Sequence, residues 1–401
     1  MTHIVVIGAG QAGVALVARL RSAGHGGPLT LIGAETAPPY QRPPLSKAYL
    51  LGEMTEERLH LRAPAFYAEN AVTLRLGQRV DAIDPGGRTL RLGSEVIAYD
   101  QLALTTGAVA RRLPSAMGGR LSGVHVVRTL ADVEAMRPEF RPGRRVVIIG
   151  GGYIGLEAAA VASKLGLDVT VVEMAPRILQ RVAAPETSAW FRALHVAHGV
   201  RLIEGTGLDC LLGETAVTAA RLTDGRILPA DFVIAGVGVL PDTALAEAAG
   251  LALDNGIATD AQGRTSAPAI WAAGDCASFP WQGGRLRLES VQNAIDQAEL
   301  VADNMLGAGR AYVPLPWFWS DQYETKLQIA GLNTGHDRIV TRGPEGGSVS
   351  FWYFRGDRLL AVDAMNDPRA YMVGKRLLET GRSPDPAAVA DPATNLKALL
   401  S

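Results

Sequence analysis

The segment from residue 146 to residue 173 constrains the fold of this chain more than any other part of the sequence. Its first four residues form a short apolar run with the composition of a buried parallel strand. Three glycines follow at G-x-G-x-x-G spacing, namely Gly150, Gly152 and Gly155. An alanine-rich stretch over residues 156–165 predicts a helix, and a second apolar run ends at Glu173. This order of elements is that of a βαβ dinucleotide-binding unit.

Each residue type in this pattern has its own purpose. Gly150 allows the tight turn, Gly152 lets the backbone approach a pyrophosphate, and Gly155 lets the helix pack closely on the strand. The helix N-terminus offers free N–H groups to the phosphates. Glu173 lies where an acid accepts hydrogen bonds from a ribose diol. Because a carboxylate repels a 2′-phosphate, Glu173 favours NADH over NADPH, although the nearby cation of Arg177 could weaken that preference.

The same pattern also opens the chain. An apolar run over residues 4–7 leads into Gly8, Gly10 and Gly13, then into a helical stretch over residues 14–22. A second apolar run over residues 29–32 leads to Glu35. A lone G-x-G-x-x-G is weak evidence, but here strand, helix, second strand and acid occur together twice. Two dinucleotide sites in one chain suggest that a hydride passes from one dinucleotide to the other.

The bulk composition is that of a globular enzyme with more than one domain. At 401 residues the chain is too long for one hydrophobic core, so two or three domains are expected. The formal net charge of −1 favours neither nucleic acid nor a membrane surface as a partner. The apolar N-terminus lacks the basic region of a signal peptide, and no apolar run is long enough to span a membrane. We therefore expect a cytoplasmic protein.

Cysteine and histidine spacing argues against a metal or dithiol centre. The only cysteines, Cys210 and Cys276, are far apart in sequence, so neither an iron–sulfur or zinc site nor a redox dithiol is expected. His195 and His198 are three residues apart on a predicted helix, a spacing that can bind a metal. No third ligand is evident, and a solvated helix face is the favoured interpretation.

Several further candidate residues lie in loops whose role the spacing alone does not decide. Residues 38–47 contain two Pro-Pro pairs, Arg42 and Lys47. They could form a plain surface turn, or they could bring Arg42 to cofactor phosphates and Lys47 to a redox centre. Asp275 ends an apolar strand, where its carboxylate could accept from sugar hydroxyls or could cap a helix. Beyond a Pro-Leu-Pro linker, residues 317–323 are rich in aromatics, which is more typical of a core or interface than of a cofactor platform.

Together these motifs resemble those of FAD-dependent, NAD(P)H-using ferredoxin reductases of the glutathione-reductase superfamily. The nearest branch is the putidaredoxin reductase and biphenyl-dioxygenase ferredoxin reductase group, and the resemblance covers nearly the whole chain. It rests on both glycine fingerprints and on RPPLSK at 42–47, TGA at 106–108, GVG at 236–238, AGD at 273–275, ESVQNA at 289–294 and FWSDQ at 318–322. Two departures, Thr105 where alanine is usual and Gln41 where an acid is frequent, remove no group that the chemistry needs.

The resemblance implies a role for individual residues. Lys47 and Glu157 would be the catalytic residues, with Lys47 near the reactive edge of the flavin and Glu157 able to pair with it. The implied FAD-binding residues are Gly8, Gly10, Gly13, Glu35, Arg42, Lys47, Thr106, Gly107, Asp275, Val291 and Trp319. The implied NADH-binding residues are Gly150, Gly152, Gly155, Glu173 and Gly238. No metal site is implied.

The motifs and the resemblance predict an α/β fold. It would contain two Rossmann-like dinucleotide-binding domains, one for FAD and one for NAD, plus a C-terminal α+β interface domain. The FAD-binding domain would be discontinuous, formed by residues 1–112 and 241–312. Residues 113–240 would form the NAD-binding domain and residues 313–401 the C-terminal domain.

The implied function is electron transfer from NADH through FAD to a [2Fe–2S] ferredoxin that serves a cytochrome P450 or a Rieske-type oxygenase. The ferredoxin would dock transiently on a small interface. Basic candidates for docking are Arg310, Arg338, Arg342, Arg369 and Lys375, each of which could equally be a solvated charge. The oligomeric state is left open.

Two other functions remain possible from the sequence. The first is an NADH oxidase or peroxidase, which would place a redox cysteine near the loop of Lys47, whereas no cysteine precedes Cys210. The second is an FAD-binding and NADH-binding interaction protein similar to apoptosis-inducing factor, whose long insertions and targeting segment are not found here.

Overall fold

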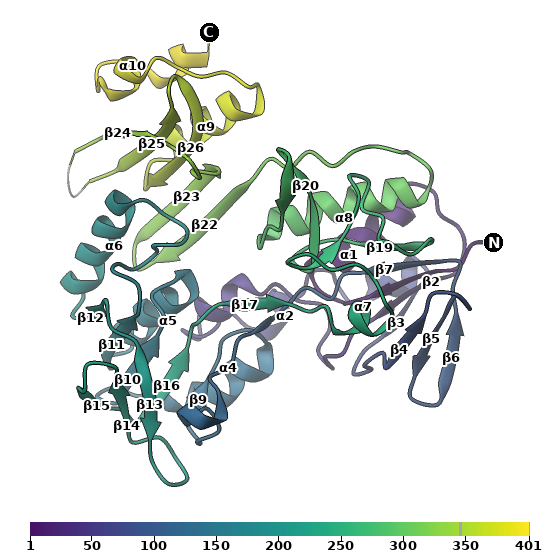
Figure 1. The fold of residues 1–401 in the computed structure, drawn as a ribbon, viewed down its shortest axis with the longest axis horizontal. Coiled ribbons are helices and arrows are strands. Elements are labelled where there is room, and N and C mark those ends of the chain that lie inside the picture. The colour runs from purple at the N-terminus through teal and green to yellow at the C-terminus, as the bar shows by residue number, and fades with distance from the viewer. Residues whose placement is uncertain (345–346, 401) are drawn as a thin grey trace. The chain divides into compact units, whose positions relative to one another are not determined.

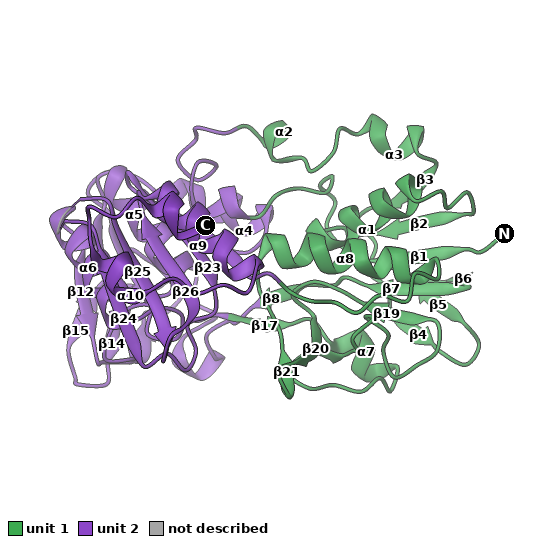
Figure 2. Cartoon of the chain, turned by 90° about the horizontal axis from the view of Figure 1, so that it is seen from above, with its two compact units in different colours: residues 1–42, 55–109, 239–314 green, residues 43–54, 110–238, 315–401 purple. Residues whose placement is uncertain are grey.

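The chain divides into two compact units, each made of three segments (Figure 2). The computed structural model describes residues 1–344 and 347–400. Unit 1 comprises Met1–Arg42, Thr55–Val109 and Val239–Pro314, and unit 2 comprises Pro43–Met54, Ala110–Gly238 and Leu315–Ser401. Unit 2 thus contains most of the predicted NAD-binding segment together with the predicted C-terminal segment. The division into three domains stays a prediction.

A five-stranded parallel sheet forms the centre of unit 1, in the order β19-β7-β1-β2-β3 (Figure 1). Its strands are β1 (Ile4–Ile7), β2 (Leu29–Ile32), β3 (Val72–Arg75), β7 (Gln101–Leu104) and β19 (Ile270–Ala272). All four residues of β1 and of β2 are buried, as expected for strands covered on both faces. Thr30 and Gln101 are the only polar residues in these five strands besides Thr73 and Arg75.

Two helices cover one face of this sheet, α1 (Gln11–Ser22) and α8 (Val291–Met305). Apolar side chains of both helices and of the sheet, such as Leu16, Val301 and Leu31, form one buried cluster. The other face packs on an antiparallel ribbon of β4 (Ala82–Asp84), β5 (Thr89–Leu92) and β6 (Glu95–Ala98), and on α7 (Ala244–Ala248). Further elements of unit 1 include α2 (Glu56–Leu59), α3 (Ala65–Glu69), β17 (Val239–Pro241), β18 (Ile257–Ala258), β20 (Ala277–Trp281) and β21 (Gly284–Leu286).

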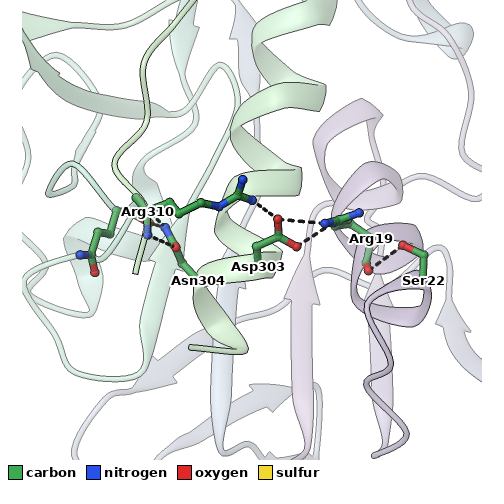
Figure 3. A network of polar contacts seen from close by, with 6 residues as sticks. Arg19, Ser22, Asp303, Asn304 and Arg310 are labelled. Atoms are coloured by element: carbon green, nitrogen blue, oxygen red, sulfur yellow. Dashed lines mark hydrogen bonds and ion pairs between the residues drawn. The ribbon is translucent and has the colours of Figure 1, made fainter. Parts of the chain in front are cut away.

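An ion-pair network ties α1 to α8 within unit 1 (Figure 3). The buried carboxylate of Asp303 on α8 accepts from Arg19 Nε at 2.6 Å and from Arg19 Nη2 at 3.1 Å. Arg310 donates to the same carboxylate, and its backbone N–H donates to the Asn304 side chain at 2.8 Å. A buried carboxylate is tolerated because it is paired on both sides.

A second parallel sheet lies in the part of unit 2 that contains the second glycine turn, in the order β12-β11-β10-β16-β9. Its strands are β9 (Val124–His125), β10 (Arg145–Ile149), β11 (Asp168–Glu173), β12 (Arg201–Glu204) and β16 (Phe232–Ala235). The helices of this part are α4 (Leu130–Met136), α5 (Tyr153–Lys164) and α6 (Pro185–Ala197), and β13 (Leu208–Leu212), β14 (Ala219–Leu222) and β15 (Ile227–Pro229) form an antiparallel sheet.

The C-terminal part of unit 2 is an antiparallel sheet in the order β22-β23-β26-β25-β24. Its strands are β22 (Trp317–Gln322), β23 (Thr325–Gly331), β24 (Arg338–Arg342), β25 (Val349–Arg355) and β26 (Arg358–Met365). One face packs on α9 (Pro368–Glu379), and α10 (Pro386–Ala390) lies beside β24. The other face shares a core with α5 and α6, in which Leu156 and Phe191 meet Phe351 and Tyr353.

The predicted α/β class is confirmed by these two parallel sheets and by the C-terminal antiparallel sheet with its helices. The helix predicted over residues 14–22 begins three residues earlier, at Gln11, directly after Gly10. Within residues 1–344 and 347–400, no helix has the length and apolar content that crossing a membrane requires.

The capping box of α4 provides a test of local stability. The Thr129 hydroxyl accepts from the Asp132 backbone N–H at 3.1 Å, and Asp132 accepts from the Thr129 N–H at 2.9 Å. We expect Thr129→Ala to lower the free energy of unfolding by about 1 kcal/mol, because orphan helix N–H groups lose a partner. Thr129→Ser keeps the hydroxyl and should stay within about 0.5 kcal/mol of the parent in urea unfolding. Equal losses for both variants would contradict the capping role.

Candidate functional site

The first glycine-rich turn, at the end of β1, leaves room for a ligand at one glycine only. A Cβ on Gly8, whose φ is +115°, would lie 2.2 Å from the Thr105 carbonyl oxygen. A Cβ on Gly13 would lie 1.9 Å from the Gly8 carbonyl oxygen. A Cβ on Gly10, the residue before α1, would meet nothing within 4 Å. Gly8 and Gly13 are therefore required by packing, whereas Gly10 borders open space at a helix N-terminus.

The second turn, at the end of β10, repeats this arrangement in unit 2. A Cβ on Gly150, with φ +106°, would lie 2.4 Å from the Gly236 carbonyl oxygen, and one on Gly155 would lie 2.2 Å from that of Gly150. A Cβ on Gly152 would again meet nothing within 4 Å. In each turn the open glycine precedes a helix whose first N–H groups have no side-chain cap. Both turns fit the pyrophosphate of a dinucleotide.

The acid at the end of each βαβ motif accepts hydrogen bonds from neighbouring groups. Glu35 accepts from Tyr40 Oη at 2.5 Å and from Arg42 Nη2 at 2.6 Å. The guanidinium of Arg42 thus lies against Glu35 and Tyr40, and its predicted contact with cofactor phosphates stays a prediction.

Glu173 is bound to the backbone of its own turn. Its Oε2 accepts from the Gly151 N–H at 2.7 Å and its Oε1 from the Ala175 N–H at 2.8 Å. Arg177 donates to the Ser188 hydroxyl at 2.5 Å and to the Gln180 carbonyl at 3.4 Å. The cation that could have weakened the preference for NADH is therefore bonded to other groups than Glu173.

Other predicted FAD residues of unit 1 lie where parallel strands end. Thr106 and Gly107 follow β7, and the Thr106 hydroxyl donates to the Asp242 carbonyl at 2.6 Å. Asp275 follows β19, and its backbone carbonyl accepts from Arg287 at 3.1 Å. Because β19, β7 and β1 are neighbours in one parallel sheet, these residues share its carboxyl edge with Gly8. Val291 begins α8, directly after the N-cap Ser290.

Gln297 is a residue to which the sequence assigned no role. Its buried Oε1 accepts from the Gly274 N–H at 2.8 Å, next to Asp275. Its Nε2 is a buried donor with no partner in the part of the chain that the structure describes. A glutamine on an alanine-rich helix face carries no distinctive sequence signal, so only the tertiary structure identifies it.

The two predicted catalytic residues meet in unit 2. Lys47 Nζ lies 2.8 Å from Glu157 Oε2, so the anticipated ion pair is present. Glu157 on α5 is 4% exposed and also accepts from the hydroxyls of Ser46 and Ser320, each at 2.6 Å. Trp319, on β22, lies beside Trp317 and Phe318 with ring centroids 5.5 and 6.4 Å away. Gly238, with φ +93°, follows β16.

The solvated interpretation of the histidine pair is wrong for one of the two residues. His195 is fully buried, and its Nε2 lies 2.8 Å from Gln322 Oε1. His198 is exposed and stacks on Tyr323 at 3.6 Å between ring centroids. Helical periodicity missed the burial because the C-terminal sheet, far away in sequence, covers this side of α6. Within residues 1–344 and 347–400, no three metal-ligating side chains are grouped around a common point.

Four of the five candidate docking cations already have partners in the fold, since Lys375 Nζ lies 4.0 Å from Glu379 Oε1 and 5.0 Å from the centroid of the Trp317 ring. Arg310 pairs with Asp303, and Arg338 donates to the Gly356 carbonyl at 2.6 Å. Arg342 donates to backbone carbonyls of the C-terminal segment, those of Val389, Asp391, Pro392 and Thr394. Arg342 therefore anchors that segment to β24.

Comparison with known families covers nearly all of the chain. Residues 2–298 match the family model described as pyridine nucleotide-disulphide oxidoreductase. Residues 317–400 match the model described as reductase C-terminal.

Two curated relatives and one solved structure match over nearly their full length. Rhodocoxin reductase of Rhodococcus erythropolis is 42% identical, covering 99% of this chain and 94% of the relative. The ferredoxin–NAD(+) reductase component of the anthranilate 1,2-dioxygenase system of Burkholderia cepacia is 41% identical. The match covers 99% of this chain and 98% of that relative. Putidaredoxin reductase, crystallised as a covalent complex with putidaredoxin, superimposes with a TM-score of 0.96 at 41% identity, covering 100% of this chain and 98% of that one.

The contrast between Gly152 and Gly155 tests the glycine roles. We expect Gly155→Ala to lower the free energy of unfolding by about 1–3 kcal/mol, because its Cβ would overlap the backbone of Gly150. Gly152→Ala should unfold like the parent but bind NADH about tenfold more weakly, because its methyl group occupies the open space before α5. Urea unfolding and NADH titration together check both variants. Normal NADH affinity in Gly152→Ala would remove that glycine from the predicted site.

The buried imidazole of His195 predicts a loss of stability in acid. Burial lowers the pKa of His195 to about 4, an effect that the hydrogen bond with Gln322 only partly offsets. The unfolded chain protonates near pH 6.5, so the contribution of His195 to stability is lost as the pH falls from about 6.5 to 4, by up to about 3 kcal/mol. We expect the stability difference between the parent and His195→Gln to follow this curve in urea unfolding.

The parent must be compared with His195→Gln because a second buried group, Asp363, changes the stability over the same pH range. Burial raises the pKa of Asp363 to about 6, despite hydrogen bonds from Tyr353 and Thr187. The folded state therefore gains stability from this group as the pH falls from about 6 towards 3.8. As the pH falls, His195 lowers the free energy of unfolding and Asp363 raises it, so a pH curve of the parent alone would show neither effect clearly. A difference curve that is flat between pH 4 and 6.5 would contradict the burial of a neutral His195.

Proposed function

Since the chain belongs to the pyridine nucleotide-disulphide oxidoreductase family, we propose that it is an FAD-dependent reductase that carries electrons from NADH to a [2Fe–2S] ferredoxin. The observation that carries this proposal is the pair of matching glycine turns, one in each unit, each with one glycine open to a pyrophosphate. The match with ferredoxin reductases over the full chain length supports the choice of acceptor.

The ferredoxin would serve a monooxygenase or a dioxygenase. One relative is named as a component of a dioxygenase system, and another is the putidaredoxin reductase seen in complex with putidaredoxin. A cytochrome P450 or a Rieske-type oxygenase is therefore the proposed final recipient of the electrons. The encounter with the ferredoxin would be transient. The cytoplasmic location expected from the sequence stays a prediction.

The residues of both units fit the two dinucleotides that this function needs. The first turn and Glu35 would hold FAD, and the second turn and Glu173 would hold NADH. FAD, when bound, supplies the chemistry that links a two-electron donor to one-electron acceptors. Lys47 would place a positive charge at the redox centre, and Glu157 would keep that ammonium in one position. The protein thus contributes orientation and electrostatics.

Replacement of Lys47 tests its assigned role. We expect Lys47→Ala to slow the reduction of flavin by NADH about a hundredfold in stopped-flow absorbance, because a fixed positive charge is lost. Lys47→Arg keeps the charge and should retain most of the rate. Lys326→Ala, which alters an exposed lysine on β23, is the matched control and should reduce flavin at the parental rate. Parental rates in Lys47→Ala would refute the role.

Stopped-flow absorbance also distinguishes a ferredoxin reductase from an oxidase and from an interaction protein. The yellow protein is mixed anaerobically with NADH and then with oxidised [2Fe–2S] ferredoxins. Fast bleaching of the flavin followed by fast ferredoxin reduction supports the proposal. Fast bleaching with rapid reoxidation by air alone indicates an oxidase, and slow bleaching with a long-lived complex indicates an interaction protein. Bleaching by NADPH but not by NADH would show that Glu173 does not select the dinucleotide.

A further inference from the structure

A line of buried polar side chains runs from Glu157 to the surface within unit 2. Ser320 Oγ donates to Glu157 Oε1 at 2.6 Å, and Gln322 Nε2 donates to Ser320 Oγ at 3.1 Å. Gln322 Oε1 lies 2.8 Å from His195 Nε2. Ser320, Gln322 and His195 have no exposed surface. Water therefore does not reach these three side chains, and each depends on the next for its hydrogen bonds.

The line joins three elements that are far apart in sequence. Glu157 is on α5, His195 is on α6, and Ser320 and Gln322 are on β22. Ser320 and Gln322 are two residues apart on a strand, so both side chains leave the same face of the sheet. This face of the C-terminal sheet packs on α5 and α6. The strand thus carries a polar connection across an interface that also contains many apolar side chains.

The direction of every hydrogen bond in this line follows from the carboxylate at its end. A carboxylate only accepts, so the Ser320 hydroxyl donates to it and its oxygen accepts from the Gln322 amide nitrogen. The amide oxygen of Gln322 then faces His195, whose Nε2 carries the proton. Nδ1 of His195 is left as an acceptor, and Tyr323 Oη lies 3.4 Å from it. All the donors therefore point towards Glu157.

This line is suited to orientation rather than to proton transport. A proton relay needs a group that can accept on one side and donate on the other. The amide nitrogen of Gln322 has no free lone pair for an incoming proton, so the amide acts as a fixed dipole. Aligned dipoles in a buried site polarise one another and strengthen the bond on the charged group at their end.

The outer end of the line is closed by a residue in a costly conformation. Tyr323 and Glu324 form the two-residue turn between β22 and β23, and Tyr323 has φ +55°. Glycine, asparagine or aspartate is the usual choice at such a position. The tyrosine ring stacks on His198, and its hydroxyl lies next to His195. A strained non-glycine residue that covers a buried imidazole is consistent with a functional constraint at this turn.

We propose that His195, Gln322 and Ser320 are positioning residues, which hold the Glu157 carboxylate in the single orientation that fixes Lys47. The ammonium of Lys47 and the hydroxyl of Ser46 bind Oε2 of Glu157. The hydroxyl of Ser320, at the end of the polar line, binds Oε1. Both carboxylate oxygens are thus engaged, and the group has no freedom to turn away from Lys47. The inference rests on the proposed function only for what Lys47 does to the flavin.

The first test measures the charge pair without any turnover. The chain has five lysines, so the acetylation of each can be followed by mass spectrometry in the FAD-loaded protein. A lysine amine that is held in an ion pair with a fixed carboxylate is shielded from the reagent and reacts slowly. We expect Lys47 to react about tenfold faster in Ser320→Ala and in Gln322→Leu. Ser320→Ala removes a buried hydrogen bond to the Glu157 carboxylate, and Gln322→Leu removes the donor that orients the Ser320 hydroxyl. Lys326 is the internal control, and its rate should not change.

The matched control variant is Ser350→Ala. Ser350 is also fully buried in the C-terminal sheet, but it bonds to Trp352 and Asp367, away from the polar line. The Ser350→Ala variant should therefore leave the acetylation rate of Lys47 at the parental value. Parental Lys47 reactivity in both Ser320→Ala and Gln322→Leu would overturn the proposal, as would an equal increase in Ser350→Ala.

The second test detects the line at its far end. Nitrogen-15 NMR of the ring signals of the seven histidines reports which nitrogen of His195 carries the proton. We expect a neutral ring protonated on Nε2 in the parent and in Ser350→Ala. Ser320→Ala should shift the His195 signals, although the side chain of Ser320 bonds to Glu157 and Gln322 and not to His195. Signals of His195 that are identical in Ser320→Ala and in the parent would overturn the proposal.

The third test relates positioning to the reaction. At saturating NADH, we expect His195→Leu and Gln322→Leu to reduce flavin about tenfold more slowly, with KM for NADH within about twofold of the parent. His195→Gln keeps an N–H donor and should restore most of the rate. A protein that NADH does not reduce would refute the proposed function, while the lysine and NMR results would still decide on the polar line. Parental flavin reduction in both leucine variants would overturn the positioning role.

Discussion

The buried carboxylate of Glu157 is the constraint on which much of unit 2 depends. A charge with so little exposed surface is stable only when donors surround it. Those donors come from the segment of Ser46 and Lys47, and from β22 in the C-terminal sheet. The need to satisfy one carboxylate therefore brings a proline-rich loop and a distant strand to the same helix.

This arrangement explains why unit 2 includes the short segment Pro43–Met54. Tyr49 in that segment donates to Glu134 at 2.6 Å, and Arg137 lies over its ring at 4.5 Å. The loop is thus fixed to α4 as well as to α5. Two independent polar attachments, together with the buried Leu45, hold Lys47 at a defined position.

The conformation of the two glycine turns could be predicted from local sequence alone. In each turn the first and third glycines are excluded from carrying a side chain by a backbone carbonyl within 2.4 Å of the Cβ position. The middle glycine has no such neighbour and borders a helix N-terminus. Because strand, turn and helix are adjacent in the chain, the spacing of three residues suffices to predict the turn.

The acids and the histidines show where prediction from sequence ends. Glu35 and Glu173 lie after the predicted strands, but their partners, such as Arg42 and the Gly151 N–H, become visible only in the fold. His195 was misjudged because helical periodicity describes one helix alone. Its burial depends on β22, whose Gln322 is 127 residues away in sequence.

The sequence by itself determined the α/β class and the two βαβ units, and the family resemblance predicted the ion pair of Lys47 and Glu157. These features depend on short-range patterns of apolar residues and glycines, which act through neighbours along the chain. Only the tertiary structure decided which polar groups share hydrogen bonds. Ser320 and Glu157 are 163 residues apart, and burial in a common core leaves each with few partners except the other members of the line. Such pairing is set by packing across elements, which no local pattern contains.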